Sequence, residues 1–488
     1  MITNWKGVKM KLSEYKFGYA DATKELMIEP EIFEQAFYDP RSILPKLVNG
    51  WKYMLIGRKG VGKSAFSAKI QYMATHEGIY YAHPIQLNDF EYTTFAKASS
   101  DADLVGTKKY LDAWNFIIIL NVYKILHNDL NITEVAEFNK TISLLDKLGF
   151  PITDTFKASV TNVSRLKLGA TVGIFDAEFE NEFGHKPISF SDRVGGLVEK
   201  MQETLNSVFL SKEVFILIDG VDDILRIKKN QLDILSSLIR SVDMLNQSFY
   251  ENKTKIKLLL FIREDIINQI TDPDLNKIKR DGAIRLSWID NTDDLKQIVE
   301  LRIKLSENQV TDKWFDIFPN DLHGKNSWES LLEHTLYKPR DVLQFLNTCQ
   351  ELYPNNEMLS YSEMKNAIKI YSRDYFVEEM KNELSGYVDD ALINTLPSTF
   401  QKIGSKSFVI ERFLQIINSQ SVVKEYNEQD IRQLLLVLFE SGYIGHLVNG
   451  NNGKQSVVFK YRNPSAAIDY GQKMLIHRGI QKGLGVIL

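Results

Sequence analysis

Short runs of consecutive apolar residues recur along the chain, each bounded by polar or glycine-containing segments. Three of them lie at Tyr53–Ile56, Val214–Ile218 and within Lys257–Ile262. Apolar runs of this length without polar alternation are typical of strands buried on both faces of a parallel sheet. Ile79–Leu87 and Ile284–Trp288 predict two further strands. The pattern therefore indicates an α/β core.

Longer segments between these strands have other periods. Ser64–Ala74 is helix-like, and Tyr110–His127 is apolar on all sides, which predicts a helix buried in a core. Phe190–Leu205 has helical spacing as well. Apolar residues occupy every second position over Leu166–Ile174, with Gly169 and Gly173 between them, which predicts an exposed strand or hairpin. We therefore expect an insertion, around residues 90–210, between elements of the core.

The C-terminal pattern predicts a small separate domain. Phe408–Ile417 is helix-like, and Asn427–Glu440 is an amphipathic helix with a capping residue at its start. Ile444–Val448 can pair with Val457–Tyr461 across the turn-rich segment Asn449–Gly453. Two helices followed by a hairpin are the order of a winged helix.

Composition narrows the class of protein. The 488 residues are 44% hydrophobic and 25% charged, which is ordinary for a globular chain of about three domains. The single cysteine, Cys349, excludes an intramolecular disulfide, and the apolar runs are too short to cross a membrane. The first residues contain no apolar segment of a secretion signal, so we expect a cytoplasmic protein without membrane partners.

The net charge of −4 provides no general attraction to nucleic acid. Any such binding must come from a local patch. Four basic residues make the C-terminal part locally positive, namely Lys454, Lys460, Arg462 and Arg478. The first three are expected on the wing, where they could contact the phosphates of duplex DNA. Winged helices also bind proteins, so a surface beside a protein-docking groove is the alternative.

The most specific chemical signal follows the first predicted strand. Residues 57–64 match the spacing G-x-x-x-x-G-K-[ST] of a phosphate-binding loop. Its glycines let backbone N–H groups converge on a polyphosphate, and the next helix directs its positive N-terminus to the same place. Lys63 is expected to reach the β- and γ-phosphates of ATP, and Ser64 to bind Mg²⁺. The expected nucleotide-binding residues are Gly57, Arg58, Lys59, Gly60, Val61, Gly62, Lys63, Ser64 and Ala65.

Acidic residues follow the strand Val214–Ile218. Asp219 stands at the carboxyl end of this strand, where ligands of parallel α/β sheets collect, and is the expected carboxylate for Mg²⁺. Asp222 and Asp223 come next, and one of them could orient or deprotonate the attacking water. We favour Asp223 as this base. The alternative is that both cap the helix that begins at Ile224.

Two arginines are candidates for sensing the γ-phosphate. Arg263 ends the strand Lys257–Ile262 and could reach the same crevice, or it could instead pair with Glu264 or Asp265. Arg340 lies in the first turn of a helix that begins with proline, and could enter the nucleotide pocket or lie on the helix surface.

Four motifs in order, GRKGVGKS, IDGVDD, FIRED and KPRDV, resemble the AAA+ and STAND classes of P-loop ATPase. FGYADA, GRKGVGKSA, KYLDAW, FKYRNP and HRGI are similar to a group of bacterial P-loop ATPases often found among genome-defence genes. The resemblance implies an α/β P-loop NTPase core at 1–305 with the inserted hairpin. A helical lid at 306–384 and a winged-helix-like domain at 385–488 would follow.

The resemblance also implies roles for single residues. Asp219 corresponds to the Walker B acid, while Arg263 and Arg340 resemble sensor 1 and sensor 2. Many AAA+ enzymes have glutamate directly after the Walker B aspartate, whereas Gly220 stands here. The sequence is closer to the STAND pattern DG-x-D-[DE], so we expect slow hydrolysis.

Three functions are compatible with these features. The first is an ATP-binding switch that self-associates and regulates a protein effector encoded nearby, in defence against phage or plasmids. The alternative is a DNA-binding AAA+ ATPase of the origin-recognition or transposition-regulator type. The third is a scaffold that does not hydrolyse ATP. The chain contains no nuclease or protease constellation that would make it the effector itself.

Overall fold

The computed structural model describes residues 10–87, 95, 110–128, 135–168, 172–184, 187, 190–220, 230–306, 313–420, 425–449 and 455–486. The chain forms two compact units. The sheet unit comprises residues 41–58 and 66–286, and the helical unit comprises residues 1–40, 59–65 and 287–488. The division into domains at 305 and 384 stays a prediction.

The sheet unit is built on five parallel strands in the order β2-β3-β4-β1-β5. The strands are β1 (Met54–Gly57), β2 (Tyr81–Gln86), β3 (Val214–Asp219), β4 (Ile256–Arg263) and β5 (Ala283–Arg285). All six residues of β3 are buried, as the continuous apolar run predicts. The expected α/β core is confirmed, and the five strands predicted for it are present with ends shifted by a few residues.

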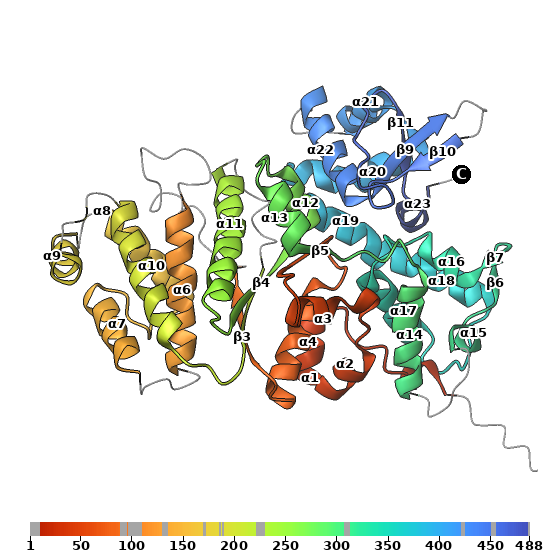
Figure 1. Ribbon diagram of the computed structural model, residues 1–488. Coiled ribbons are helices and arrows are strands. Elements are labelled where there is room, and N and C mark those ends of the chain that lie inside the picture. The colour runs from red at the N-terminus through yellow and green to blue at the C-terminus, as the bar shows by residue number, and fades with distance from the viewer. Residues whose placement is uncertain are drawn as a thin grey trace, which may run out of the picture. The chain divides into compact units, whose positions relative to one another are not determined.

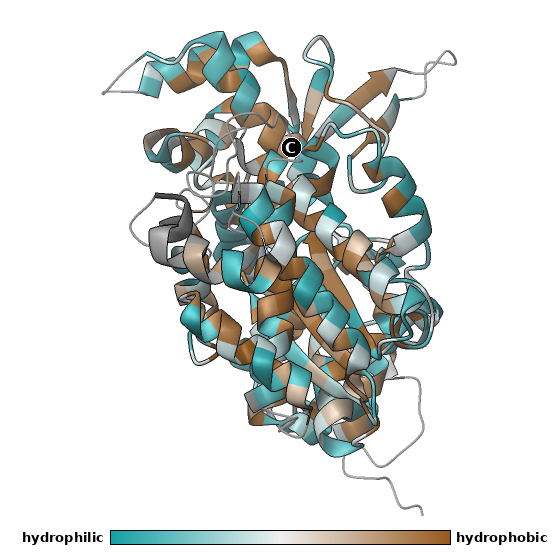
Figure 2. Ribbon diagram, turned by 60° about the vertical axis from the view of Figure 1, so that its left-hand side comes forward, coloured by the Kyte–Doolittle hydropathy of each residue, from teal (hydrophilic) through white to brown (hydrophobic). Residues whose placement is uncertain are grey.

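Helices cover this sheet in layers. The long helix α11 (Asn230–Glu251) packs on β4, α6 (Leu111–Asn128) packs on α11, and α10 (Phe190–Ser207) packs on α6 (Figure 1). Helix α6 is buried on all sides, as its sequence predicts. Its Trp114 donates a hydrogen bond to the carbonyl oxygen of Ile234 at 2.9 Å, which satisfies the indole N–H in the core. Apolar residues gather on the strands, and hydrophilic residues on the outer helix faces (Figure 2).

The remaining elements of the sheet unit are all helical. They are α3 (Ile43–Val48), α7 (Ala136–Lys147), α8 (Phe156–Leu168), α9 (Val172–Phe183), α12 (Glu264–Gln269) and α13 (Leu275–Gly282). Helix α4 (Lys63–His76) begins in the helical unit and continues into the sheet unit.

The predicted hairpin at Leu166–Ile174 is wrong. Residues up to Leu168 end α8, residues from Val172 begin α9, and residues 169–171 lie outside the described part of the chain. The alternation therefore spans the junction of two helices. Leucine and alanine are good helix formers, and a period of two over so few residues does not outweigh the helical spacing of Val160 and Val163, which are buried in α8.

The N-terminal elements of the helical unit pack on later helices. Helix α1 (Ala22–Ile28) contacts α2 (Pro30–Ala36), and α2 contacts α14 (Asp293–Ser306). Arg302 of α14 forms two hydrogen bonds of 2.6 and 2.8 Å with the buried carboxylate of Glu25. Gly18 lies against this pair, with φ at +76°, and a Cβ atom there would lie 1.9 Å from the Arg302 guanidinium. The glycine of the FGYADA motif is therefore required for packing.

The middle of the helical unit contains short helices and one small hairpin. Its elements are α15 (Lys313–Ile317), β6 (Asp321–Leu322), β7 (Lys325–Asn326), α16 (Ser327–Leu332), α17 (Pro339–Leu352), α18 (Tyr361–Tyr371), η5 (Ser372–Phe376) and α19 (Val377–Leu384). The element η5 is a π-helical turn, so α18, η5 and α19 form one continuous helix with a wider turn inside it.

The C-terminal part of the helical unit contains the predicted helices and hairpin. Its elements are α20 (Asp390–Ile403), β8 (Ser407–Phe408), α21 (Ile410–Gln420), α22 (Glu428–Ser441), β9 (Ile444–Asn449), β10 (Gln455–Val458), β11 (Lys473–Ile476) and α23 (Arg478–Leu484). Asn427 caps α22 as predicted. The four strands form an antiparallel sheet in the order β10-β9-β11-β8, which gives the winged-helix-like architecture.

Candidate nucleotide-binding site

The phosphate-binding loop lies between β1 and α4. Gly60 and Gly62 have φ angles of +78° and +101°, which glycine adopts without a steric penalty. The indole of Trp288 donates a hydrogen bond of 2.8 Å to the carbonyl oxygen of Val61 and so fixes the loop within the helical unit. Helix α4 begins at Lys63, directly after the loop, so its N-terminus with the positive end of the helix dipole lies at the end of the loop. This geometry fits a bound polyphosphate.

The carboxyl edge of the sheet brings three of the predicted site residues onto neighbouring strands. Gly57 ends β1 and lies in register with Arg263 at the end of β4, while Asp219 ends the adjacent strand β3. Asp219 is 9% exposed and accepts a hydrogen bond of 2.8 Å from the backbone N–H of Gly220. Gly220 has φ at +82°, which turns the chain sharply after the strand. The catalytic candidates Asp222 and Asp223 lie outside the described residues.

Arg263 has a carboxylate partner. Its guanidinium forms two hydrogen bonds with the carboxylate of Asp265, at 3.0 and 2.6 Å, and its side chain is 8% exposed. Pairing with Asp265 was one of the two alternatives that the sequence left open. Arg263 is buried in this pair, while the Asp265 side chain is 27% exposed.

The start of α17 lies against the loop within the helical unit. A Cβ atom on Gly60 would be 3.4 Å from Cδ of Lys338 and 3.5 Å from both Cβ and Cδ of Arg340. These are ordinary or slightly tight van der Waals contacts. Arg340 is half-buried, and none of the described residues accepts a hydrogen bond from its guanidinium. The structure thus places Arg340 beside the phosphate-binding loop.

One contact of the loop was missed by the sequence analysis. The ammonium of Lys59 lies 3.6 Å from Glu379 and 3.7 Å from Glu383, both on α19. The two glutamates are four residues apart, so they project from one face of the helix. The spacing of the two glutamates is the one sequence feature that could have indicated a contact with Lys59. It is not specific, because many solvent-exposed helices have glutamates at the same spacing.

The DNA patch proposed on the wing stays a prediction, and two of its residues have contacts within the protein. Lys460 donates a hydrogen bond of 2.8 Å to the carbonyl oxygen of Ala466 and lies 3.4 Å from Glu440. Arg462 donates to the hydroxyl of Tyr337 at 3.1 Å and stacks on the rings of Tyr337 and Tyr461. Both residues follow β10 and lie outside the hairpin strands, and Arg462 is exposed to solvent in spite of its contacts. Lys454 lies outside the described residues.

The motifs FKYRNP and HRGI meet in the helical unit. Arg478 forms an ion pair with Glu333, and the hydroxyl of Tyr461 lies 3.2 Å from Nε2 of the buried His477. Burial lowers the pKa of His477 well below its ordinary value, and the neighbouring His334 and Arg462 lower it further. The imidazole is therefore neutral at physiological pH. These motif residues join α16 and the start of α17 to the C-terminal sheet.

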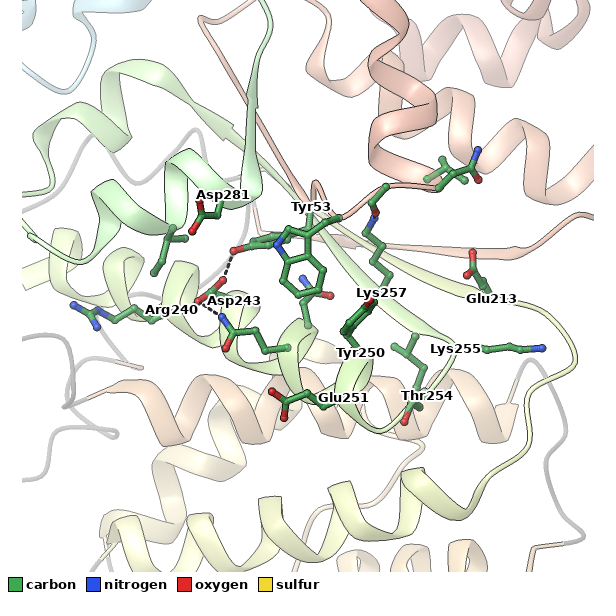
Figure 3. A pocket seen from close by; sticks show the side chains of 18 of the residues that line it. Tyr53, Glu213, Arg240, Asp243, Tyr250, Glu251, Thr254, Lys255, Lys257 and Asp281 are labelled. Atoms are coloured by element: carbon green, nitrogen blue, oxygen red, sulfur yellow. Dashed lines mark hydrogen bonds between the residues drawn. The ribbon is translucent and has the colours of Figure 1, made fainter.

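A large cleft of about 1000 Å³ opens at the opposite, amino edge of the sheet (Figure 3). Trp51 and Tyr250 meet edge to face at 5.3 Å in its wall, and Tyr53 donates a hydrogen bond to Asp243. Lys257 donates to two backbone carbonyls there, and burial lowers its pKa to about 8. No residue of the phosphate-binding loop lines this cleft. Because ligands of parallel sheets bind at the carboxyl edge, the cleft is not the nucleotide site.

The described residues contain neither a cluster of metal ligands nor a membrane-spanning helix. No group of three or more histidine, cysteine, aspartate or glutamate side chains there is arranged to hold a metal ion. Mg²⁺ bound together with a nucleotide needs no such group, because phosphates and water supply most of its ligands. None of the helices in the described part of the chain is long and apolar enough to cross a membrane.

The strand order and the loop define the class. A parallel sheet with the phosphate-binding loop directly after β1, and with β4 between β1 and β3, is a P-loop NTPase fold with the strand order of AAA+ ATPases. A family model of the FunZ-associated C-terminal helical domain matches residues 293–378.

Two curated proteins are similar in sequence. The transposon gamma-delta 80.3 kDa protein of Escherichia coli K12 is 25% identical over 296 residues, and the match covers 56% of this chain. This chain spans only 40% of that protein's length. Allergen Alt a 2 of Alternaria alternata is 25% identical over 189 residues, which are 36% of this chain and 95% of the allergen.

Two solved structures align over nearly the whole chain. The ORC2 protein of Aeropyrum pernix, solved as ADPNP–ADP complexes, is 11% identical with a TM-score of 0.42, covering 94% of this chain and 96% of its own. The CDC6P protein of Pyrobaculum aerophilum is 12% identical with a TM-score of 0.31, covering 98% and 99%. At these scores the fold assignment rests on the strand order and the loop described above.

Proposed function

We propose that the protein is an ATP-binding, slowly hydrolysing switch of the AAA+ class. The observation that carries the proposal is the phosphate-binding loop together with its contacts in the helical unit. Arg340 of α17 lies beside Gly60, and Glu379 and Glu383 of α19 face Lys59. A nucleotide in the loop therefore adds its charge next to two helices that lead to the C-terminal part. The two nucleotide states can favour different positions of these helices.

Each residue has a chemical role in this proposal. The loop amides and Lys63 bind the phosphates, and Ser64 and Asp219 hold Mg²⁺, which would neutralise phosphate charge. Asp223, or alternatively Asp222, acts as the base for the attacking water. Arg340 reports the γ-phosphate, and Arg263 contributes only when it releases the carboxylate of Asp265. Glycine at position 220, where many AAA+ enzymes have glutamate, supports slow turnover.

Binding and turnover can be separated by three variants. Asp223→Asn should keep Mg²⁺-ATP binding but reduce phosphate release in a steady-state assay, because it removes a base without altering the loop. Asp219→Asn should weaken Mg²⁺-dependent binding as well. Normal hydrolysis by Asp223→Asn together with loss in Asp222→Asn would reassign the base. ATP binding without measurable hydrolysis in the wild type would favour the scaffold function.

Duplex DNA is the target that the comparisons favour over a defence effector. The similarity to a transposon-encoded protein covers 56% of the chain, and the C-terminal sheet is winged-helix-like. The proposed defence role rests on sequence motifs alone. Self-association and a separately encoded protein effector remain compatible with either target.

The structure suggests a revised set of DNA contacts. Exposed cations remain on and beside the strand pair β8–β11, namely Lys406, Arg412 and Lys473. Each phosphate contact contributes about −0.9 to the slope of log affinity against log salt concentration, so three contacts predict a slope of about −3. Duplex affinity should be measured across a salt series for the wild type and the triple alanine variant. Absence of binding with and without ATP would leave a protein as the target.

A further inference from the structure

Lys59 connects the phosphate-binding loop to α19. Its ammonium lies within 4 Å of two carboxylates, those of Glu379 and Glu383. The Lys59 side chain is 25% exposed, and the glutamates are 22% and 6% exposed. The ion pairs are thus partly shielded from water and only partly screened by salt. The distances exceed those of hydrogen bonds, so the attraction is mainly that of charges.

Helix α19 also contacts the C-terminal part of the helical unit. It packs on α22 and α23, which follow it in the chain. Tyr443, just before β9, is fully enclosed. Burial raises the pKa of its hydroxyl, and the negative charges of Glu383 and Glu379 raise it further. The same two glutamates therefore lie between the loop and the base of the C-terminal sheet.

A triphosphate in the loop changes the electrostatics of this contact. Its phosphates would attract the Lys59 ammonium and repel the carboxylates of α19, because unlike charges attract and like charges repel one another. We propose that Glu379 and Glu383 form an acidic latch that competes with nucleotide phosphate for Lys59, so that ATP binding releases α19 from the loop. This inference rests on the proposed ATP-binding function and specifies how binding is transmitted.

Thermodynamic reciprocity sets the sign of the effect. If ATP weakens the contact of α19 with the loop, then removing the contact must strengthen ATP binding by the same factor. Couplings between sites are typically about 5- to 150-fold. Because the ion pairs of Lys59 are partly exposed to water, we expect the coupling between the α19 contact and ATP binding to be at the lower end of this range, about fivefold.

The test uses the full-length protein with Glu379→Gln and Glu383→Gln combined. These changes keep side-chain size and remove both charges without altering the loop. Glu378→Gln is the matched control, because Glu378 lies on the same helix and pairs with Lys381 instead. Mg²⁺-ATP affinity is measured by calorimetry, and amide hydrogen exchange of residues 377–384 is measured with and without the non-hydrolysable analogue ADPNP.

The double variant should bind ATP about fivefold more tightly than the wild type, and the control should be unchanged. ADPNP should increase exchange in α19 of the wild type and the control. In the double variant exchange should be high already without nucleotide. Thermal unfolding without nucleotide checks that the double variant is folded. The single variant Glu383→Gln should have an ATP affinity between those of the wild type and the double variant.

The outcomes separate the two proposals. No ATP binding by the folded wild type would overturn the proposed function itself. ATP binding with equal affinity in the wild type and the double variant, or exchange in α19 that ADPNP leaves unchanged, would overturn the latch and leave ATP binding intact. Raising the salt concentration should bring the affinities of the wild type and the double variant closer together, because salt screens the charges that distinguish them.

Discussion

Two arginines expected to sense the γ-phosphate stand in different surroundings. Arg263 at the end of β4 is buried and holds the carboxylate of Asp265 through two hydrogen bonds. Arg340 at the start of α17 lies beside Gly60, and no described residue accepts a hydrogen bond from it. To reach a phosphate, Arg263 must give up two charge-assisted hydrogen bonds, whereas Arg340 gives up none of that kind with the residues that the structure describes. The availability of an arginine is set by its other partners as well as by its position.

Arg263 and Arg340 can be compared as sensors only if a nucleotide binds. The largest expected effect is therefore that of Lys63→Ala, which should abolish nucleotide binding. This change removes the cation expected to contact the β- and γ-phosphates. At ATP concentrations about a hundredfold above the dissociation constant, the wild type should gain about 2.7 kcal/mol of unfolding free energy, and the variant should gain none. Urea unfolding with and without Mg²⁺-ATP measures both. Equal gains in the two proteins would show that the loop is not the nucleotide site; Lys46→Ala, at an exposed position, is the control.

Arg263→Ala should mainly lower stability. It leaves the carboxylate of Asp265 without its partner in a site that is 27% exposed, which should cost about 2 kcal/mol of unfolding free energy without nucleotide. The preference for ATP over ADP should change by less than about threefold, since Asp265 already occupies the guanidinium. A large loss of that preference at unchanged stability would identify Arg263 as the sensor that its sequence motif resembles.

Arg340→Ala should act on nucleotide discrimination. We expect ATP affinity to fall about tenfold while ADP affinity is retained, equivalent to about 1.4 kcal/mol for one charge-assisted contact with the γ-phosphate. Titrations with both nucleotides measure the ratio. Arg373→Ala is a suitable control, because Arg373 is an exposed arginine of the same unit that pairs with Asp374. Equal losses for ATP and ADP would contradict a sensor role.

Asp265→Asn should have the smallest effect on ATP affinity, and it tests directly whether Asp265 keeps Arg263 from the phosphate. The amide keeps the shape of the side chain but weakens the pair, so Arg263 becomes more available to a phosphate. ATP affinity should rise about threefold if Arg263 reaches the nucleotide at all, which corresponds to about 0.7 kcal/mol. Affinity for ATP that does not change in this variant would restrict Arg263 to a structural role. The unfolding free energy of the variant without nucleotide provides the reference.

The sheet and the loop could be predicted because their signals are local. A buried parallel strand is a continuous apolar run, and the phosphate-binding loop is a single contiguous motif with glycine at positions that need positive φ. The end of β3 also placed Asp219 at the carboxyl edge. Each of these features depends on residues within one short segment, so no knowledge of distant contacts was needed.

The interaction partners of the charged side chains could not be predicted in this way. Lys59 meets α19 some 320 residues later in the chain, and Arg462 meets Tyr337 across 125 residues. Nothing in their local sequence distinguishes them from solvated surface charges. The same limit applies to Leu166–Ile174, where alternation across a helix junction imitates a strand. Burial and partners decide such cases, and both arise only when the chain folds.

The π-helical turn at Ser372–Phe376 determines which side chains face the loop. An α-helix rotates by about 100° per residue, so one additional residue in a turn changes the direction of every later side chain on the same continuous helix. Glu379 and Glu383 follow that turn. Deleting one residue within it would leave their chemistry intact but rotate them about 100° away from Lys59. The number of residues in this turn therefore determines which face of α19 is directed at the phosphate-binding loop, whatever the charges on that face.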